Sequence, residues 1–569
     1  MKSTKLLLLV AFMPAWIYAQ NRYDVVIDEI MADPTPQIGL PNNEWIELKN
    51  TTSSPINLQN WRIGDLSGQS GPLPNFTLQP DSFVIICTGS AVAAMSSFGT
   101  VISVTSFPSL DNDGDQLYLK AANGMIIHAV AYSTSWYQNE VKKEGGWSLE
   151  MIDTKSPCNG INNWKASTNT SGGTPGKKNS IDAVNNDANG PQLKRAYTTD
   201  NTTIILVFDE PVDSLKGGTI TNYTIDGGIT IASATTISPI FNTVSLKTNN
   251  ALSANTIYNI TANNITDCNN NTIASPNKVK IGLPADASAG EWIINEILFN
   301  PKPNAYDYIE FYNNSNKIFD ASKLYIANRN GSGVVSSIKP LSTTPWYFFP
   351  ADHMVVTEDA NNLALNYLVK NPENVLIVSP LPSFPDDEGN IVVLNLQGDI
   401  IDEVKYKDDW HFKLIDDPEG VSLERIDHSA PSQSEINWHS AASTAGYGTP
   451  TYKNSQVKDF QVITATINVT PKVFSPDNDG FNDIATIQYK IDEPGYVANI
   501  TIFDAAGRPV KNLVRNSIIG VNGYWNWDGL DDKNQKLPVG TYIVLTEIFN
   551  LRGKKEVFKN TIVLARRLN

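Results

Sequence analysis

The sequence contains one long pattern twice, and this duplication limits the folds that the chain can adopt. Both copies keep the same blocks in the same order, with similar spacing between them. The blocks are 24–29, 44–48, 110–119, 124–132, 148–150, 163–164 and 173–175 in the first copy, and 291–296, 308–311, 384–394, 398–406, 422–424, 437–438 and 448–450 in the second. Each copy covers roughly 150 residues and can bury its own core, unlike a solenoid repeat. We therefore expect a duplicated domain.

The composition and the local patterns predict strands. Short runs of β-branched and aromatic residues are bounded by clusters of Gly, Pro, Asn and Asp, and no stretch shows sustained helical periodicity. Charged residues make up only 18% of the chain, which does not fit a disordered polypeptide. The predicted fold is all-β, with four sandwich domains in tandem at 20–180, 181–286, 287–456 and 457–569.

The first 19 residues have the features of an export signal. Lys2 and Lys5 precede an apolar run at 6–17, and Ala19 offers a small residue for cleavage. The run is too short for an anchor, no cysteine follows it to carry a lipid, and no later stretch is long and apolar enough to span a membrane. We expect 1–19 to be a signal peptide and the mature chain to be secreted or held at the cell surface.

The first copy resembles a known domain family. The blocks that carry the resemblance are 27–30, 43–50, 58–63 and 173–176. They look like the lamin tail domain, an immunoglobulin-like sandwich that is also found in secreted bacterial proteins. The resemblance covers essentially the whole copy, and it implies the same immunoglobulin-like fold for the second copy, at 287–456.

Three structural roles can be expected inside this domain. The alternation from Glu44 to Leu48 predicts a strand with Glu47 on a wet face. Trp61 is expected in the core because of its large apolar area. The Asn-Trp pairs at 163–164 and 437–438 are expected to cap one end of each sandwich, with carbohydrate stacking by the tryptophans as the alternative.

The other two segments carry separate resemblances. Residues 202–208, 222–225, 243–246 and 258–265 resemble a bacterial immunoglobulin-like repeat of the S-layer and adhesin kind, which implies a spacer. The blocks 473–483, 500–504, 506–508, 527–529 and 537–542 resemble the immunoglobulin-like domain of flagellar hook-capping proteins and of gliding-associated C-terminal modules. That resemblance implies a sorting signal for type IX secretion, with the outer-membrane secretion machinery as a partner.

One loop of the last module is a candidate calcium site. Side-chain oxygens alternate around a glycine turn, as a hard cation requires, but no Glu stands at the twelfth position of an EF-hand. The candidate ligands are Asp477, Asn478, Asp479, Asn482 and Asp483. The alternative is a turn whose Asx side chains bind its own backbone. A weaker candidate for a metal is the turn with Asp111, Asp113 and Asp115, which a solvent-facing turn also explains.

Catalytic signatures are missing from the sequence. There is no nucleophile elbow, phosphate-binding loop, zinc-protease motif or C-x-x-C, and the five histidines show no ligand pairing at helical spacing. The three cysteines, Cys87, Cys158 and Cys268, allow at most one disulfide; unpaired thiols are favoured, and Cys87–Cys158 would lie within one domain.

The charge balance argues against nucleic acid as a partner. The net charge is −16, and the basic pairs along the chain are isolated. The function favoured by the sequence is non-catalytic: two modules that present binding surfaces to a cell-surface protein or glycan, in adhesion or outer-membrane assembly. The alternatives are an accessory or catalytic part of an extracellular hydrolase acting on nucleic acid, phosphoester or polysaccharide, and a structural surface-layer component.

Overall fold

A computed structural model describes residues 20–458 and 464–566, so the predicted signal peptide lies outside the described residues. The described chain is mostly strands with a few short helices, which confirms the all-β prediction. It divides into two compact units, Met1–Ala251 with Tyr258–Lys280, and Leu252–Ile257 with Ile281–Asn569. Below, these are the first unit and the second unit. No helix in the described residues has the length and apolarity to cross a membrane.

The first copy folds as two sheets around one core. One sheet has the order β11-β10-β1-β2-β6-β7 and the other β4-β8-β9. Trp61 is buried in the core between them, as predicted. The strands are β1 (Val25–Met31), β2 (Trp45–Asn50), β4 (Arg62–Gly64), β6 (Phe83–Cys87), β7 (Val101–Ser103), β8 (Gly114–Lys120), β9 (Ile126–Ser133), β10 (Leu149–Met151) and β11 (Trp164–Ala166), with the small pair β3 (Ile56–Asn57) and β5 (Thr77–Leu78) and the short helix α1 (Val92–Met95).

The second copy repeats this plan, with one additional strand, β23, in its smaller sheet. Its sheets have the orders β30-β29-β19-β20-β25-β26 and β23-β22-β27-β28. The strands are β19 (Trp292–Leu298), β20 (Tyr308–Asn313), β22 (Leu324–Arg329), β23 (Val335–Pro340), β25 (His353–Thr357), β26 (Val375–Ile377), β27 (Glu388–Asn395), β28 (Ile400–Lys407), β29 (Leu423–Arg425) and β30 (Trp438–Ser440), with the pair β21 (Phe319–Asp320) and β24 (Tyr347–Phe348) and the helix α3 (Ala360–Asn366). The matching order of the six-stranded sheets supports the duplication inferred from the sequence.

The prediction of a wet face on β2 is wrong. Every residue of β2 is buried, including Glu47. Ile46 and Leu48 pack into the core between the sheets, while Trp45 on the other face packs with Met95 of α1. Because α1 and its neighbouring loops cover the outer face, the alternation of residue types along this strand does not mark exposure.

The spacer in the first unit has two sheets, β12-β13-β16-β15 and β14-β17-β18. Its elements are β12 (Leu193–Thr198), β13 (Thr203–Phe208), β14 (Tyr223–Ile225), β15 (Ile231–Thr236), β16 (Thr243–Thr248), β17 (Tyr258–Ala262), β18 (Lys278–Ile281) and the helix α2 (Ser214–Gly217). A disulfide joins Cys158 of the first copy to Cys268 of the spacer, and Cys87 is free and buried. The expectation of three unpaired thiols is therefore wrong, and so is the Cys87–Cys158 alternative.

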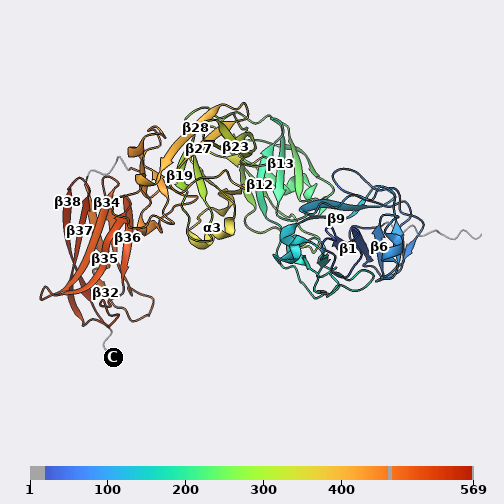
Figure 1. Ribbon diagram of the computed structural model, residues 1–569, viewed down its shortest axis with the longest axis horizontal. Helices are drawn as coiled ribbons and strands as arrows, with labels where there is room; N and C mark the ends of the chain where they lie inside the picture. Colours follow the sequence, from blue (N-terminus) through green and yellow to red (C-terminus); the bar gives the residue numbers. More distant parts are fainter. Residues whose placement is uncertain (1–19, 459–463, 567–569) are drawn as a thin grey trace, which may run out of the picture. The chain divides into compact units, whose positions relative to one another are not determined.

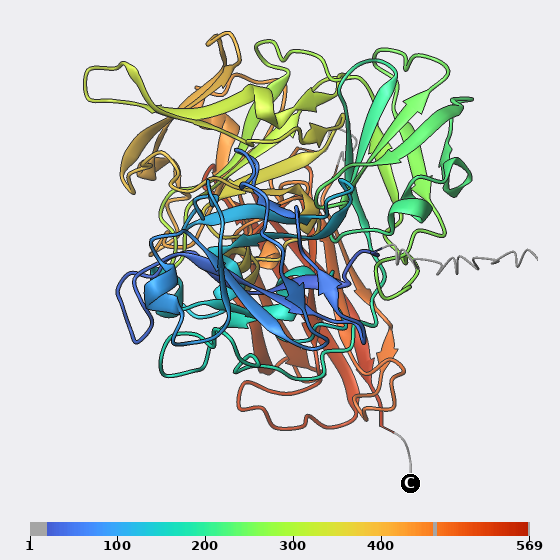
Figure 2. The same cartoon turned by 90° about the vertical axis from the view of Figure 1, so that its right-hand side faces the viewer.

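The C-terminal module is a sandwich of a five-stranded and a three-stranded sheet. The orders are β32-β38-β37-β34-β35 and β31-β33-β36. Figure 1 shows its long strands side by side in red, and Figure 2 shows them from a second direction. They are β31 (Thr466–Thr470), β32 (Val473–Phe474), β33 (Ala485–Lys490), β34 (Tyr496–Asp504), β35 (Pro509–Ile519), β36 (Asn522–Trp527), β37 (Gly540–Asn550) and β38 (Lys555–Leu564).

This module is in direct contact with the second copy. Thr444 Oγ1 lies 2.8 Å from the hydroxyl of Tyr489, and the Ser443 hydroxyl donates to the carbonyl of Ile518 at 2.7 Å. Phe412 of the second copy packs against Val497 and Ile518 of the module. The disulfide within the first unit and these contacts within the second show that the domains of each unit are in contact with one another.

Candidate functional site

Three glutamates of the first copy form a buried row across its larger sheet. Glu29 on β1 is in register with Glu47 on β2 and with Glu150 on β10, and all three are 0% exposed. Residues in register on neighbouring strands project from the same face of a sheet. Buried carboxyls are costly unless they bind donors, so their partners decide what the row does.

The donors come from the segment that ends the first copy, residues 173–181, which we name the first closing loop. The amide of Thr174 donates to Glu29 at 2.7 Å, and the amide of Gly176 donates to Glu47. The Thr174 hydroxyl lies 2.9 Å from Glu150 Oε1 and 3.2 Å from Glu29 Oε2. The carboxyls thus accept hydrogen bonds from backbone amides of a loop that does not pair with any described strand of the sheet.

The second copy repeats the arrangement with Glu296, Glu310 and Glu424, all 0% exposed. Its closing loop, residues 448–456, donates from Thr449 N to Glu296 at 2.8 Å and from Thr451 N to Glu310 at 2.6 Å. Both glutamate rows and both Gly-Thr-Pro segments lie within the repeated sequence blocks. The sequence signal for these buried glutamates was that the same acid recurs at equivalent positions of both copies. The sequence prediction used strand alternation instead, which placed Glu47 on the solvent side.

Burial dominates the acid–base behaviour of both rows. It raises the pKa of Glu29 and of Glu424 to about 8 and that of Glu296 to about 7, from an ordinary 4.5, with neighbouring carboxyls adding to the effect. The pKa values of Glu47 and Glu310 are also raised, first by burial. The raised pKa values of Glu29 and Glu424 favour the protonated carboxyl at neutral pH.

The two rows differ at two neighbouring positions. In the second copy, Asn295 donates to Glu310 Oε1 at 2.8 Å, and His353 Nδ1 lies 2.9 Å from the same oxygen. In the first copy Asp28 takes the place of Asn295, and Phe83 takes that of His353. As a result, Glu47 Oε1 and Asp28 Oδ1 are buried without hydrogen-bond partners.

A second difference concerns the β-bulge in the first strand of each copy. In the first copy, His128 Nδ1 accepts a hydrogen bond from Ile27 N at 2.9 Å; in the second, Asp402 accepts one from Ile294 N at 2.7 Å. The two side chains differ but accept from the same backbone position. Arg425, 3.4 Å from Asp402, offsets the buried charge in the second copy.

The structure brings together three of the five predicted calcium ligands. Carboxylate oxygens of Asp477, Asp479 and Asp483 lie within 4.8 Å of one another, while Asn478 and Asn482 hold left-handed backbone at φ 61° and 53°. Asp483 accepts amides of the loop itself, from Asn478 at 2.7 Å and from Gly480 at 2.8 Å. The residues thus fit a cation, but the loop also satisfies its own backbone, so calcium stays a prediction.

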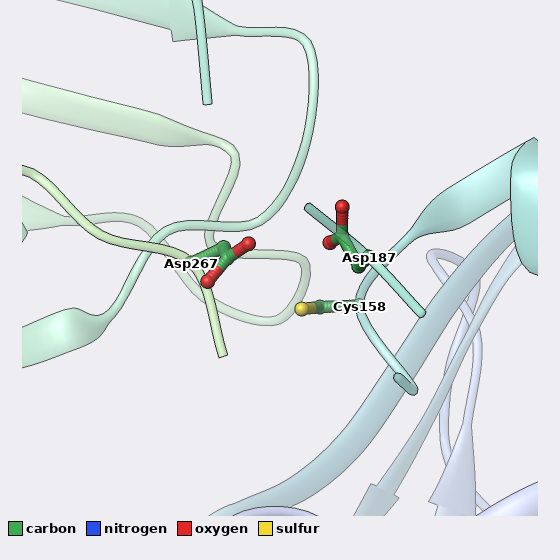
Figure 3. A group of neighbouring side chains, drawn as sticks. All are labelled: Cys158, Asp187 and Asp267. Atoms are coloured by element: carbon green, nitrogen blue, oxygen red, sulfur yellow. The ribbon is translucent and has the colours of Figure 1, made fainter. Parts of the chain in front are cut away.

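The weaker metal candidate gains no support from the geometry. Within the described residues, the carboxylates of Asp111, Asp113 and Asp115 are not gathered within 4.8 Å of one another. A different group is gathered in the first unit: Cys158, Asp187 and Asp267 approach one another from three segments (Figure 3). Because Cys158 is in a disulfide, it offers no thiolate to a metal.

The Asn-Trp pairs do not stand at an exposed end. Trp164 is 1% and Trp438 is 3% exposed, and both lie in their cores. A carbohydrate-stacking role is therefore wrong, because no ring face is open to a ligand. Asn163 Nδ2 donates to the carbonyls of Asp153 and Ser156, both at 2.8 Å, so this asparagine shapes the loop before the strand.

The first unit has a polar hollow of about 680 Å³ beside its first copy. Lys49, Asp81 and Phe83 line one part of it, and Lys155 and Asp187 another. Lys49 lies 3.4 Å from Asp81, so some of the charges compensate one another.

Comparison with protein families agrees with this architecture. A family model described as Lamin Tail Domain matches residues 19–134. The chain contains a lamin tail domain. A second model, described as Bacterial Ig-like domain, matches residues 188–281, and a third, described as CHU_C Type IX secretion signal domain, matches residues 468–564. These matches confirm the resemblances of the first copy, the spacer and the C-terminal module, and the chain carries a domain matched as a type IX secretion signal.

Solved structures add little to this identification. The N-terminal part of the bacterial S-layer protein SbsC is 14% identical over 28% of the lamin-tail chain and 44% of its own, with a TM-score of 0.16. A tetra-tandem repeat of a large adhesion protein is 13% identical over 95% and 99% of the two chains, with a TM-score of 0.13. At these TM-scores neither likeness supports an argument. A comparison with curated proteins found no match.

Proposed function

We propose that this lamin-tail protein is exported by type IX secretion and acts without catalysis on the extracellular side of the outer membrane. There its two lamin-tail copies present binding surfaces to a surface protein or glycan, in adhesion or in assembly. The secretion signal domain at 468–564 supports the route. The observation that carries the binding role is the repeated fold, with the same six-strand order in both copies.

The buried glutamate rows fit a structural role better than a catalytic one. All six acids are 0% exposed, and each accepts hydrogen bonds from a closing loop. A general acid or base must reach its substrate within hydrogen-bond distance, which these positions do not allow. The raised pKa values of Glu29, Glu296 and Glu424 follow from burial and from the neighbouring carboxyls.

Two tethered copies of one binding module gain affinity for a repeated ligand. The second binding event becomes intramolecular, so avidity can exceed the affinity of either copy by a factor of about 10² to 10⁴. The polar hollow is a candidate contact surface of the first unit, and Lys155, which lines it, is exposed.

A binding experiment can test this proposal directly. Fragment 20–281, fragment 282–569 and the full chain are compared for binding to intact cells and to their isolated surface polysaccharide. Tighter binding by the full chain supports the proposal, and Lys155→Ala should weaken the first fragment. Equal affinities for one copy and two would count against it. Turnover of DNA, a phosphoester or the polysaccharide by the purified chain would favour the hydrolase instead.

A further inference from the structure

The threonine of each closing loop lies between two carboxyls. Thr449 Oγ1 is 2.8 Å from Glu424 Oε1 and 3.0 Å from Glu296 Oε2. A hydroxyl has a single proton and can donate to only one of two carboxyl oxygens. The other contact is a hydrogen bond only if that carboxyl carries a proton. Thr174 in the first copy poses the same requirement, at 2.9 Å from Glu150 and 3.2 Å from Glu29.

We propose that each lamin-tail copy holds one buried proton between its two threonine-bridged glutamates, and that this proton locks the closing loop. The proposal does not depend on the exported binding function. It adds to the fold a device that responds to pH, built from the same residues in both copies.

In the second copy, the hydrogen-bond donors around the two glutamates indicate which carboxyl carries the proton. Glu296 Oε1 accepts from Thr449 N at 2.8 Å, from the hydroxyl of Tyr308 at 2.7 Å and from the hydroxyl of Ser422. Glu424 Oε2 accepts from two donors, Ser455 Oγ and Gln456 N, each at 2.8 Å. More donors stabilise the ionised form, so Glu296 carries the charge and Glu424 Oε1 the proton. The Thr449 hydroxyl then accepts from Glu424 and donates to Glu296.

In the second copy, the described residues around the pair do not supply a cation to replace this proton. The titratable groups that face the pair are Glu310 on β20, His353 on β25, and the tyrosines Tyr308, Tyr367 and Tyr452. His353 is already next to Glu310, at 2.9 Å. Arg425, adjacent to Glu424 in sequence, donates to the carbonyl of Ile294 at 2.7 Å instead. The pKa of Glu424, raised to about 8 by burial, agrees with a proton held at neutral pH. In the first copy, Lys142 interacts electrostatically with Glu150, which leaves Glu29 as the carboxyl that holds the proton.

Loss of this proton leaves two carboxylates facing one hydroxyl. Like charges in a buried site repel each other strongly, and the loop that bridges them is the element that can yield. In the second copy the loop also holds the C-terminal module: Val521 N donates to the Ser455 carbonyl at 2.9 Å, and Gln456 Nε2 donates to the Ile519 carbonyl at 3.4 Å. Deprotonation therefore loosens this junction as well.

Hydrogen–deuterium exchange of the full chain tests the proposal. The readout is the exchange of peptides from 448–456, 517–521 and 173–181 between about pH 6 and about pH 9, corrected for intrinsic rates, since Glu424 titrates near 8. We expect the wild-type protein to lose about tenfold protection at both closing loops over this range, one pKa unit being a factor of ten. Protection of segment 517–521 should decrease together with that of the closing loop of the second copy.

Glu424→Gln is the decisive variant. Its amide can donate to Thr449 Oγ1 from the place of the protonated oxygen, while its carbonyl accepts from Ser455 and Gln456. Protection at 448–456 should then be independent of pH, while 173–181 in the same molecule still responds. Glu29→Gln should give the mirror result in the first copy, because Glu29 is the carboxyl there whose pKa is raised to about 8. Three outcomes overturn the proposal: wild-type loops that do not respond to pH, a variant that responds like wild type, and a variant whose second copy is unprotected at pH 6.

Discussion

The side-chain amide of Asn295 donates a 2.8 Å hydrogen bond to Oε1 of Glu310, an oxygen whose counterpart in the first copy, on Glu47, has no partner. The difference follows from two substitutions between the copies. Asp28 occupies the position of Asn295. Phe83 occupies that of His353, which lies 2.9 Å from the same Glu310 oxygen. Desolvation raises the pKa of Asp28 to about 7. The first copy therefore has a buried acid, Asp28, at the position where the second copy has an amide that donates to the neighbouring glutamate.

Exchanging these residues should move the stability of the two copies in opposite directions. Asp28→Asn supplies a donor toward Glu47 and removes a buried acid, so it should stabilise the first copy by about 1 kcal/mol or more at neutral pH. Asn295→Asp should destabilise the second copy by about 1–3 kcal/mol. Urea unfolding of fragments 20–281 and 282–569 measures both changes. Two changes of the same sign would contradict the account.

The raised pKa of Glu29 should make the stability of the first copy fall as the pH rises from about 4.5 to about 8. The folded value is about 8 against an ordinary 4.5 in the unfolded chain, so the unfolded state releases its proton first. Stability from this group is present below about pH 4.5 and is lost as the pH rises toward 8. The Glu29→Gln variant has no titratable side chain at this position. The unfolding free energy of the variant should therefore rise relative to wild type across this window, and a constant difference would argue against the assignment.

The disulfide between Cys158 and Cys268 should stabilise the first unit substantially. It closes a loop with a sequence separation of 110 residues, and a loop of this length gains roughly 3–5 kcal/mol from the restricted unfolded chain. Replacing both cysteines by serine should lower the melting temperature of fragment 20–281. Fragment 282–569, which has no cysteine, serves as the control for added reductant. A first unit that melts at the same temperature without the disulfide would exclude this role.

Calcium should stabilise the C-terminal module if the cluster of Asp477, Asp479 and Asp483 binds it. Calcium added to chelator-treated protein is then expected to raise the melting temperature of the module. Asp479→Asn should remove the response, because it neutralises one ligand while an amide oxygen can still accept from Phe481 N. Asp483 is a poor test, since it also holds loop amides at 2.7 and 2.8 Å. An unchanged melting temperature would leave the loop as an Asx turn alone.

Much of the fold could be predicted from the sequence, because duplication and turn chemistry act locally. The repeated blocks, the all-β class and the buried Trp61 were all accessible in this way. The glutamate row was not, because strand alternation cannot show that α1 and a closing loop cover the outer face of β2. Cys158 and Cys268 lie 110 residues apart, and only the packing of two domains brings them together.

The central claim is that this lamin-tail protein reaches the cell exterior through its last module. The most direct measurement is the distribution of the chain between cell fractions and medium, with and without residues 457–569, in a host that has type IX secretion. The full chain should be found at the surface or in the medium, and the truncated chain should remain in the periplasm. A truncated chain that still reaches the exterior would contradict the account.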